Sequence, residues 1–235
     1  MMSKFNINKI EPWSAHFKSL EPGYLAEIRT SVKKAHGAIV NIAVDGEHSP
    51  SAPEKDEREA AVRFSKQWID AALAVGSPSI RTNLPPAGKS APDFDRIVDS
   101  LQQVAEYAAV KNIVVNLEND NPLTEDPLFL VKVIQRVNNP YLHALPDFAN
   151  SLTAFDEQHA YSGIDAMFEL AYNICHVKET ESAPDGHAVH VDMPKTFGFL
   201  KQHRYKGYLS MEFDSAGEPY QGTKDLIQQT LHYLS

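Results

Sequence analysis

The chain has 235 residues, with 22 basic and 31 acidic side chains that give a formal net charge of −9. This acidic surplus argues against a nucleic-acid backbone or an anionic membrane as the main partner, because both are negatively charged. The single cysteine, Cys175, excludes a disulfide framework and any zinc site built from cysteines alone. No apolar run approaches the roughly 20 residues that span a bilayer, and residues 1–8 lack the apolar core of a signal peptide. We therefore expect a soluble cytoplasmic protein.

Short apolar runs rich in β-branched residues alternate along the chain with longer amphipathic ones. The short runs are typical of strands. We expect strands at Asn8–Trp13, Ala38–Val44, Ser79–Leu84, Ile113–Asn119, Leu142–Phe148, Asn173–Val177 and Tyr208–Phe213. The runs Glu54–Val75 and Asp93–Val110 have helical spacing, and Asp126–Pro127 is a typical helix start. Gly37 and Gly76 lie where helices would end.

This alternation predicts an α/β fold with parallel strands joined by crossover helices. The candidates are a closed TIM-type (β/α) barrel and an open doubly wound sheet, and the absence of G-x-G-x-x-G disfavours the second. A barrel of this type has eight strands and about 250 residues, whereas seven strands are readable here. The first βα unit is therefore missing or replaced before Asn8: the chain is a fragment, the gene begins late, or Lys4–Trp13 substitutes for the unit.

We expect one barrel domain over residues 1–235. With its first unit absent, the strands Asn8–Trp13 and Tyr208–Phe213 would lack their usual shared neighbour. They are expected to pair with each other or with another chain, which would make a homo-oligomer, because long unpaired edges invite association.

Four of the later predicted strands end in a side chain that can bind a metal. These residues are Glu118, Asp147, His176 and Glu212, and they are separated by 29, 29 and 36 residues, close to one βα unit each. Any one of them alone would be read as a helix cap or a surface residue. Four in successive units lie together at the carboxyl-terminal rim of a barrel, where active sites form.

Each of the four side chains ends an apolar run, so each is expected to be at least partly buried. Buried carboxylates without a compensating cation cost several kcal/mol each, which favours a bound divalent metal. Carboxylate oxygens with one imidazole nitrogen suit Mn2+ best, with Mg2+, Co2+ or Zn2+ as alternatives. We therefore expect one divalent metal ion as the cofactor.

Four segments carry a resemblance to a known family: Val-Val-Asn-Leu-Glu-Asn, Leu-Pro-Asp-Phe-Ala-Asn, His-Val-Lys-Glu and Gly-Tyr-Leu-Ser-Met-Glu. They resemble the sugar phosphate isomerase/epimerase family of the xylose isomerase-like TIM barrel superfamily. The resemblance runs from about Asn8 to the C-terminus. It implies that one divalent metal is bound by Glu118, Asp147, His176 and Glu212.

The chain departs from this family pattern in two places. The family has a first strand and helix before Asn8. Many members also have a histidine where this chain has Asn150, and the DNA-repair branch needs further histidines that are absent from Arg81-Thr82-Asn83. With the acidic charge, these absences argue against an endonuclease.

Other residues are candidates for substrate contact. Lys178 lies two residues after His176, so it points to the same side of the strand and could hold a substrate oxygen or form a salt bridge within the rim. Arg81 would bind a substrate anion or form a structural ion pair. Trp13 would line a sugar pocket or pack the core, and Asn150 would face the substrate.

Two neighbouring features are read as structural. His187 and His190, with Asp185, suggest a second metal site, but their Gly/Pro/Asp-rich setting before the helix start at Asp192 is more typical of a loop. Cys175 adjoins His176 and should point away from it into the helix layer as a buried apolar residue.

The expected function is a metal-dependent isomerase or epimerase that moves a proton next to a carbonyl on a sugar or similar polyhydroxylated substrate. Glu118 and Glu212 would be the acid/base pair around an enediolate, and the metal would polarise the substrate oxygens. Two alternatives remain open. One is a metal-dependent dehydratase or lyase on a keto-polyol, and the other is a non-catalytic sugar-binding or truncated barrel.

Overall fold

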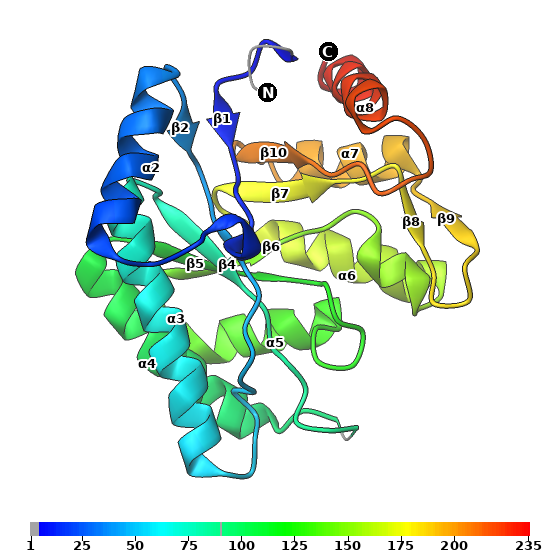
Figure 1. Cartoon of the computed structure of the whole chain (residues 1–235). Coiled ribbons are helices and arrows are strands. Elements are labelled where there is room, and N and C mark those ends of the chain that lie inside the picture. Colours follow the sequence, from blue (N-terminus) through cyan, green and yellow to red (C-terminus); the bar gives the residue numbers. More distant parts are fainter. Residues whose placement is uncertain (1–4, 90) are drawn as a thin grey trace. The chain divides into compact units, whose positions relative to one another are not determined.

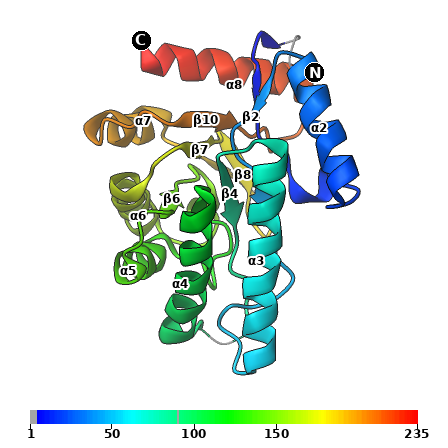
Figure 2. The ribbon, with the colours of Figure 1, turned by 90° about the vertical axis from the view of Figure 1, so that its left-hand side faces the viewer.

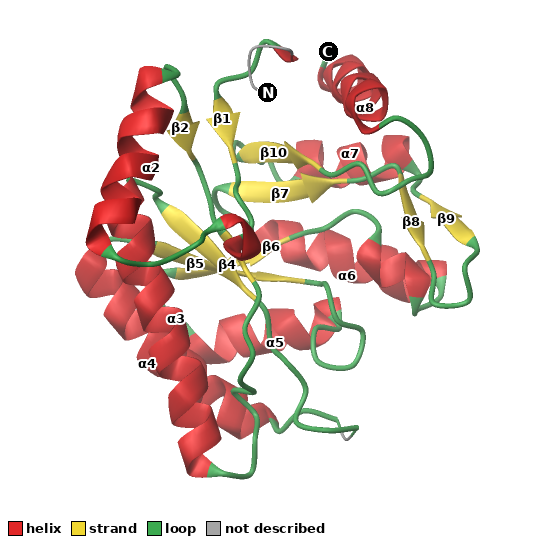
Figure 3. Cartoon of the chain, in the orientation of Figure 1, coloured by secondary structure: helices red, strands yellow, loops and turns green. Residues whose placement is uncertain are grey.

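The computed structural model describes residues 5–89 and 91–235, and its strands and helices alternate as expected (Figures 1 and 3). All seven predicted strand runs contain strands, and the run Ala38–Val44 contains two. The strands are β1 (Lys9–Ile10), β2 (Ala38–Ile39), β3 (Ala43–Val44), β4 (Ser79–Thr82), β5 (Val114–Glu118), β6 (Leu142–Leu145), β7 (Ile174–Val177) and β10 (Tyr208–Met211). The helices are α2 (Pro22–Lys34), α3 (Lys55–Val75), α4 (Phe94–Lys111), α5 (Pro127–Val137), α6 (Glu157–Leu170), α7 (Met193–Gln202) and α8 (Pro219–Leu234), with short 3-10 turns at Ser14–His16 and Asn150–Thr153.

The described residues group into two compact units. The first comprises the chain up to Leu117 together with Val133–His143, and the second comprises Glu118–Lys132 together with Ala144–Ser235. A single domain over residues 1–235 and a pairing of β1 with β10 stay predictions. Lys4, the first residue of the segment Lys4–Trp13, lies outside the described residues, and Phe5–Asn8 contain no strand.

The strands of the first unit pair in parallel, as the crossover pattern predicts. β1 pairs with β2, with Lys9 opposite Ala38. β3, β4, β5 and β6 follow one another in one sheet, and β4 pairs with β5 with Thr82 opposite Leu117. Helices α3 and α4 pack side by side in both views (Figures 1 and 2). Their buried residues form apolar faces at helical spacing, which is why these segments are helices.

The helix ends follow the predicted signals except at one place. Helix α3 ends at Gly76, which has a φ of 85°, and α4 begins after Asp93, whose carboxylate accepts a hydrogen bond from a backbone N–H of the first turn. After α2, however, the left-handed residue is His36, with a φ of 54°. Gly37 follows it and donates its N–H to the carbonyl of Val32 at 2.9 Å. The C-cap of α2 is Ala35, so the prediction of Gly37 as the cap was wrong by two residues.

The core of the second unit lies around β7. Phe148 and Phe197 are fully buried and meet edge to face with their ring centroids 5.6 Å apart. Cys175 is fully buried in this apolar core, as predicted. Because alternate residues of a strand point to opposite faces, the neighbouring His176 points the other way.

A hairpin occupies the segment that was predicted as a loop. Strands β8 (Thr180–Ser182) and β9 (Ala188–His190) pair antiparallel, with Thr180 opposite His190. The predicted helix start at Asp192 is confirmed, because its carboxylate accepts a hydrogen bond from the N–H of Lys195 at 3.0 Å. No helix among the described residues is long and apolar enough to cross a membrane.

Candidate metal centre

Strand pairing in the second unit brings the four predicted rim residues together. The chain continues past β6 as an extended segment, where Asp147 pairs with His176 of β7. In the ladder of β7 and β10, His176 lies opposite Ser210, and the N–H of Glu212 binds the carbonyl of Val177 at 3.0 Å. Glu118 is the last residue of β5. Their ligand atoms all lie within 4.8 Å of one another.

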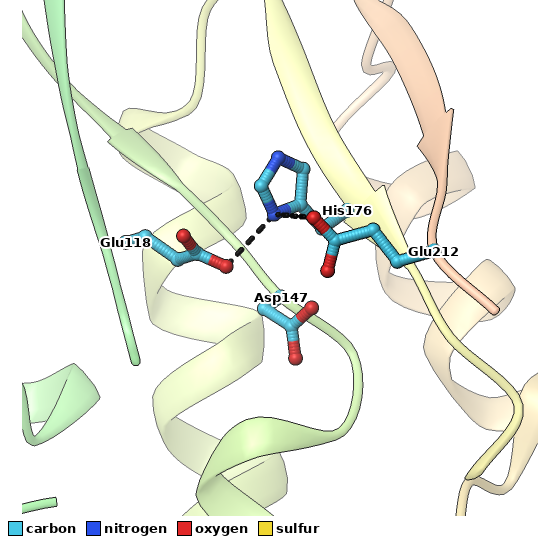
Figure 4. A group of neighbouring side chains, drawn as sticks. All are labelled: Glu118, Asp147, His176 and Glu212. Atoms are coloured by element: carbon cyan, nitrogen blue, oxygen red, sulfur yellow. Dashed lines mark hydrogen bonds and ion pairs between the residues drawn. The ribbon is translucent and has the colours of Figure 1, made fainter. Parts of the chain in front are cut away.

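His176 lies between the two glutamates. Its Nδ1 is 2.8 Å from an oxygen of Glu118 and 3.1 Å from an oxygen of Glu212. Figure 4 shows the two carboxylates reaching this nitrogen from opposite sides, with Asp147 next to them. Glu118 is 2% exposed and Asp147 and His176 are fully buried, whereas the side chain of Glu212 is 33% exposed. The cluster is therefore open to solvent on the Glu212 side.

Asp147 is held by backbone groups and by one side-chain amide. Its Oδ1 accepts hydrogen bonds from the N–H groups of Ala149 at 2.8 Å and Asn150 at 2.7 Å. Asn119 accepts from the N–H of Asp147 at 2.8 Å and donates to its carbonyl at 3.1 Å. Asn119 directly follows Glu118 in one of the family-like segments, but no spacing in the sequence indicates this role.

Burial determines the electrostatics of Asp147. Loss of water raises the pKa of this carboxyl to about 7, the nearby ammonium of Lys178 opposes the rise, and the charges of Glu118 and Glu212 add to it. Lys178 is affected in the opposite sense. Burial lowers its pKa, but Asp147, Glu212 and Glu118 outweigh burial, so the pKa of Lys178 lies above its ordinary value and the ammonium stays charged.

The donor set of these four residues fits a divalent metal. Asp147 Oδ2 is buried and has no hydrogen-bond partner among the described residues, and the ammonium of Lys178 is 3.8 Å from it. Such an oxygen is costly unless a cation binds it. Three carboxylates and one imidazole are oxygen and nitrogen donors of the kind that Mn2+ and similar ions take.

The predicted substrate contacts fall into two groups. Asn150 is 8% exposed and Lys178 5% exposed, and both lie beside the cluster. Asn150 donates to Glu118 at 3.4 Å, and Lys178 binds Glu212 at 3.0 Å. The prediction that Lys178 points to the same side as His176 is thus confirmed.

Trp13 and Arg81 lie in the first unit and share one partner, Asp45. Trp13 Nε1 donates to one oxygen of Asp45 at 2.6 Å, and Arg81 binds the other oxygen at 2.6 Å. Trp13 is 45% exposed, so it is not a core residue. Arg81 is buried in β4, and of its two predicted roles the structure contains the ion pair.

The hairpin histidines do not join the four-residue cluster. His187 bonds to Asp185 at the exposed tip, and His190 lies on β9. Among the described residues, the group of potential metal ligands is Glu118, Asp147, His176 and Glu212. The hairpin contributes another residue that sequence reasoning missed: Glu181 on β8, which binds Lys178 at 3.0 Å.

Parallel strands joined by crossover helices, with a cluster of ligand-type side chains at strand ends, define a protein of the α/β class. The model of the xylose isomerase-like TIM barrel family matches residues 3–234. The chain therefore belongs to this family, and the barrel prediction is confirmed over the doubly wound alternative.

Solved structures share this fold at low sequence identity. D-psicose 3-epimerase from Clostridium cellulolyticum H10, solved with D-tagatose, has a TM-score of 0.81 and 14% identity, covering 100% of this chain and 91% of that chain. A xylose isomerase domain protein from Planctomyces limnophilus has a TM-score of 0.76 and 20% identity, covering 98% and 88%. The 3-keto-D-glucoside 4-epimerase from E. coli has a TM-score of 0.74 and 17% identity, covering 98% and 91%. A search of curated proteins gave no significant match.

Proposed function

We propose that this protein is a metal-dependent isomerase or epimerase that moves a proton next to a carbonyl of a sugar or similar polyhydroxylated substrate. One observation carries the proposal: two glutamates, one aspartate and one histidine from four separate strand ends place their ligand atoms within 4.8 Å. The names of the structural neighbours support it, because two of them are sugar epimerases.

The metal would be held by Glu118, Asp147, His176 and Glu212, and Mn2+ is the first candidate. When bound, such an ion supplies Lewis-acid chemistry that makes a hydrogen next to a carbonyl more acidic. Before a metal binds, the chain already holds the ligand atoms of these four residues close together. His176 Nδ1 lies against oxygens of both Glu118 and Glu212, so each glutamate already has one oxygen directed to the shared centre.

The proton transfer is assigned to the two glutamates. One carboxylate removes the proton from the carbon beside the carbonyl and leaves a planar enediolate. The other, as a carboxylic acid, returns a proton to the opposite face, which inverts the carbon. Glu118 and Glu212 approach His176 from opposite sides, which supports their assignment to the two faces of the substrate (Figure 4). Asn150 lies beside this cluster and is the candidate for holding a hydroxyl of the substrate, while substrate contacts by Arg81 and Trp13 stay predictions.

Deuterium incorporation tests the proposal. The Mn2+-loaded protein is incubated in D2O with a panel of ketoses, ketose phosphates and hydroxy-keto acids, and incorporation beside the carbonyl is followed by NMR. We expect wash-in with at least one compound, and a loss of about 100- to 10,000-fold in Glu118→Gln and in Glu212→Gln. Loss of a β-hydroxyl together with wash-in would favour a lyase. No wash-in with any compound would favour a sugar-binding role.

A further inference from the structure

Lys178 directly follows β7 and has all three ammonium protons engaged. Its Nζ lies 3.0 Å from Asn150 Oδ1, 3.0 Å from Glu181 Oε2 and 3.0 Å from Glu212 Oε2. A lysine ammonium has three N–H donors and no acceptor. Three acceptors therefore use its whole hydrogen-bonding capacity, and a substrate oxygen could bind Lys178 only by displacing one of them.

The partners of Lys178 form a continuous bridge between the two glutamates. Asn150 accepts from Lys178 through its Oδ1 and donates through its Nδ2 to Glu118 Oε1 at 3.4 Å. Lys178 in turn holds Glu212 Oε2. Asn150 is itself fixed, because its backbone N–H binds Asp147 Oδ1 at 2.7 Å. The order is thus Glu118, Asn150, Lys178, Glu212, and every link is a side-chain contact.

The two oxygens of Glu212 have different partners because of this bridge. Oε1 lies 3.1 Å from His176 Nδ1, inside the cluster, whereas Oε2 lies 3.0 Å from the ammonium of Lys178. A carboxylate with one oxygen held by an ammonium offers the other oxygen alone to a metal. The same ammonium lies 3.8 Å from Asp147 Oδ2, so it competes with a metal for two of the four ligand residues.

Resting on the proposed metal-dependent function, we propose that Lys178 is a positioning residue and not a substrate contact. With Asn150 it fixes the distance between Glu118 and Glu212, and it keeps Glu212 as a one-oxygen ligand by occupying the second oxygen. The ammonium of Lys178 therefore lowers the metal affinity of the four ligand residues. It also holds the two glutamates in place for proton transfer.

Mn2+ titration without substrate is the first test. Free Mn2+ is measured by electron paramagnetic resonance in the wild type, in Lys178→Met and in Lys201→Met, which removes an exposed lysine of α7 as a matched control. We expect Lys178→Met to bind Mn2+ about tenfold more tightly, because a competing positive charge near 4 Å is lost. Lys201→Met should equal the wild type. Unchanged or weaker binding in Lys178→Met would overturn the proposal.

Steady-state kinetics supply the second readout. A positioning role predicts that Lys178→Met lowers kcat about 100-fold while KM stays within about threefold, because misplacing a reacting group by about 1 Å has an effect of this size. A raised KM with an unchanged kcat would instead identify a substrate contact. If the chain turns over no sugar at all, the proposed reaction fails, yet tighter Mn2+ binding in Lys178→Met would still support the competition by Lys178.

Asn150→Leu keeps the proposal testable if Lys178→Met does not fold. This variant breaks the bridge but retains the ammonium, so kcat should fall while the Mn2+ affinity stays within about threefold of the wild type. Full activity in Asn150→Leu, with circular dichroism showing a folded chain, would contradict the bridge.

Discussion

The side-chain amide of Asn119 binds both backbone groups of Asp147. Its oxygen accepts from the N–H at 2.8 Å, and its nitrogen donates to the carbonyl at 3.1 Å. The same nitrogen also donates to Ser151 at 2.8 Å. A residue of one strand end thereby fixes the backbone of the next, just where the most buried carboxylate of the cluster begins.

Removing this amide should disturb the metal centre without touching a ligand. We expect Asn119→Ala to weaken Mn2+ binding by about 10- to 100-fold, the range found when groups that orient metal ligands are lost. The measurement is the same Mn2+ titration, with Asn121→Ala as a control because Asn121 Oδ1 accepts a hydrogen bond from the N–H of Leu123 within its own turn. Equal Mn2+ affinities of Asn119→Ala and the wild type would show that Asp147 does not need Asn119 for its position.

Loss of a ligand residue should have a larger effect. Asp147→Ala and His176→Ala are each expected to lower the Mn2+ affinity by at least about 100-fold, more than the loss of an orienting group does. The purified variants should therefore contain less metal than the wild type. Metal analysis by mass spectrometry measures this, and His187→Ala at the hairpin tip is the histidine control. Full metal retention in both ligand variants would remove the proposed site.

The pKa of Asp147 predicts how the metal-free protein responds to pH. Burial raises this pKa from 3.8 to about 7, so between these values the folded state keeps a proton that the unfolded state releases. Stability of the metal-free protein should therefore fall as pH rises through this window. Metal must displace the proton, so Mn2+ affinity should increase up to about pH 7.

Thermal unfolding of the chelator-treated protein between pH 5 and pH 8 checks this expectation. Asp147→Asn cannot ionise, so its midpoint should vary less with pH over that range. A wild-type midpoint that rises with pH, with a parallel rise in Asp147→Asn, would assign the dependence to other groups.

Two helix glycines should respond to alanine in opposite directions. A Cβ on Gly163 of α6 would overlap the ring of Pro127, the first residue of α5, whereas a Cβ on Gly198 of α7 would meet no atom within 4 Å. We expect Gly163→Ala to lower the free energy of unfolding by about 1–3 kcal/mol, as overpacking does. Gly198→Ala should raise it by about 0.5–1 kcal/mol, because alanine favours helix. Urea unfolding measures both, and a stabilised Gly163→Ala would show that Pro127 moves aside easily.

Trp13 offers an optical test of its predicted substrate contact. The chain has two tryptophans, and Trp13 is 45% exposed whereas Trp68 is 6% exposed. Iodide should therefore quench mainly Trp13. If Trp13 contacts the substrate, a saturating sugar identified by deuterium wash-in should reduce this quenching. Unchanged quenching would contradict a substrate contact by Trp13.

The sequence was sufficient for the parallel strands and for the clustering of the four rim residues, because both follow from regular spacing. Glu118, Asp147, His176 and Glu212 each lie at or within two residues of a strand end, and parallel strands bring their ends together. Asn119 and Glu181 could not be found in this way. Their roles depend on hydrogen bonds between segments, and polar residues beside a strand end have no spacing that distinguishes such a contact from exposure to water. The hairpin of β8 and β9 was hidden for a similar reason, because Gly and Pro mark its turn while its strands have three residues each.

The base and the tip of that hairpin differ in their contacts. Its base carries Glu181, which holds Lys178, while the tip around Asp185 and Gly186 is exposed and turns through a positive φ of 88° at Gly186. Residues added at the tip would lengthen the ribbon without shifting the pairing at its base. Evolution or a protein engineer can therefore extend this segment while the strand pairing and the contact between Glu181 and Lys178 at its base stay as they are.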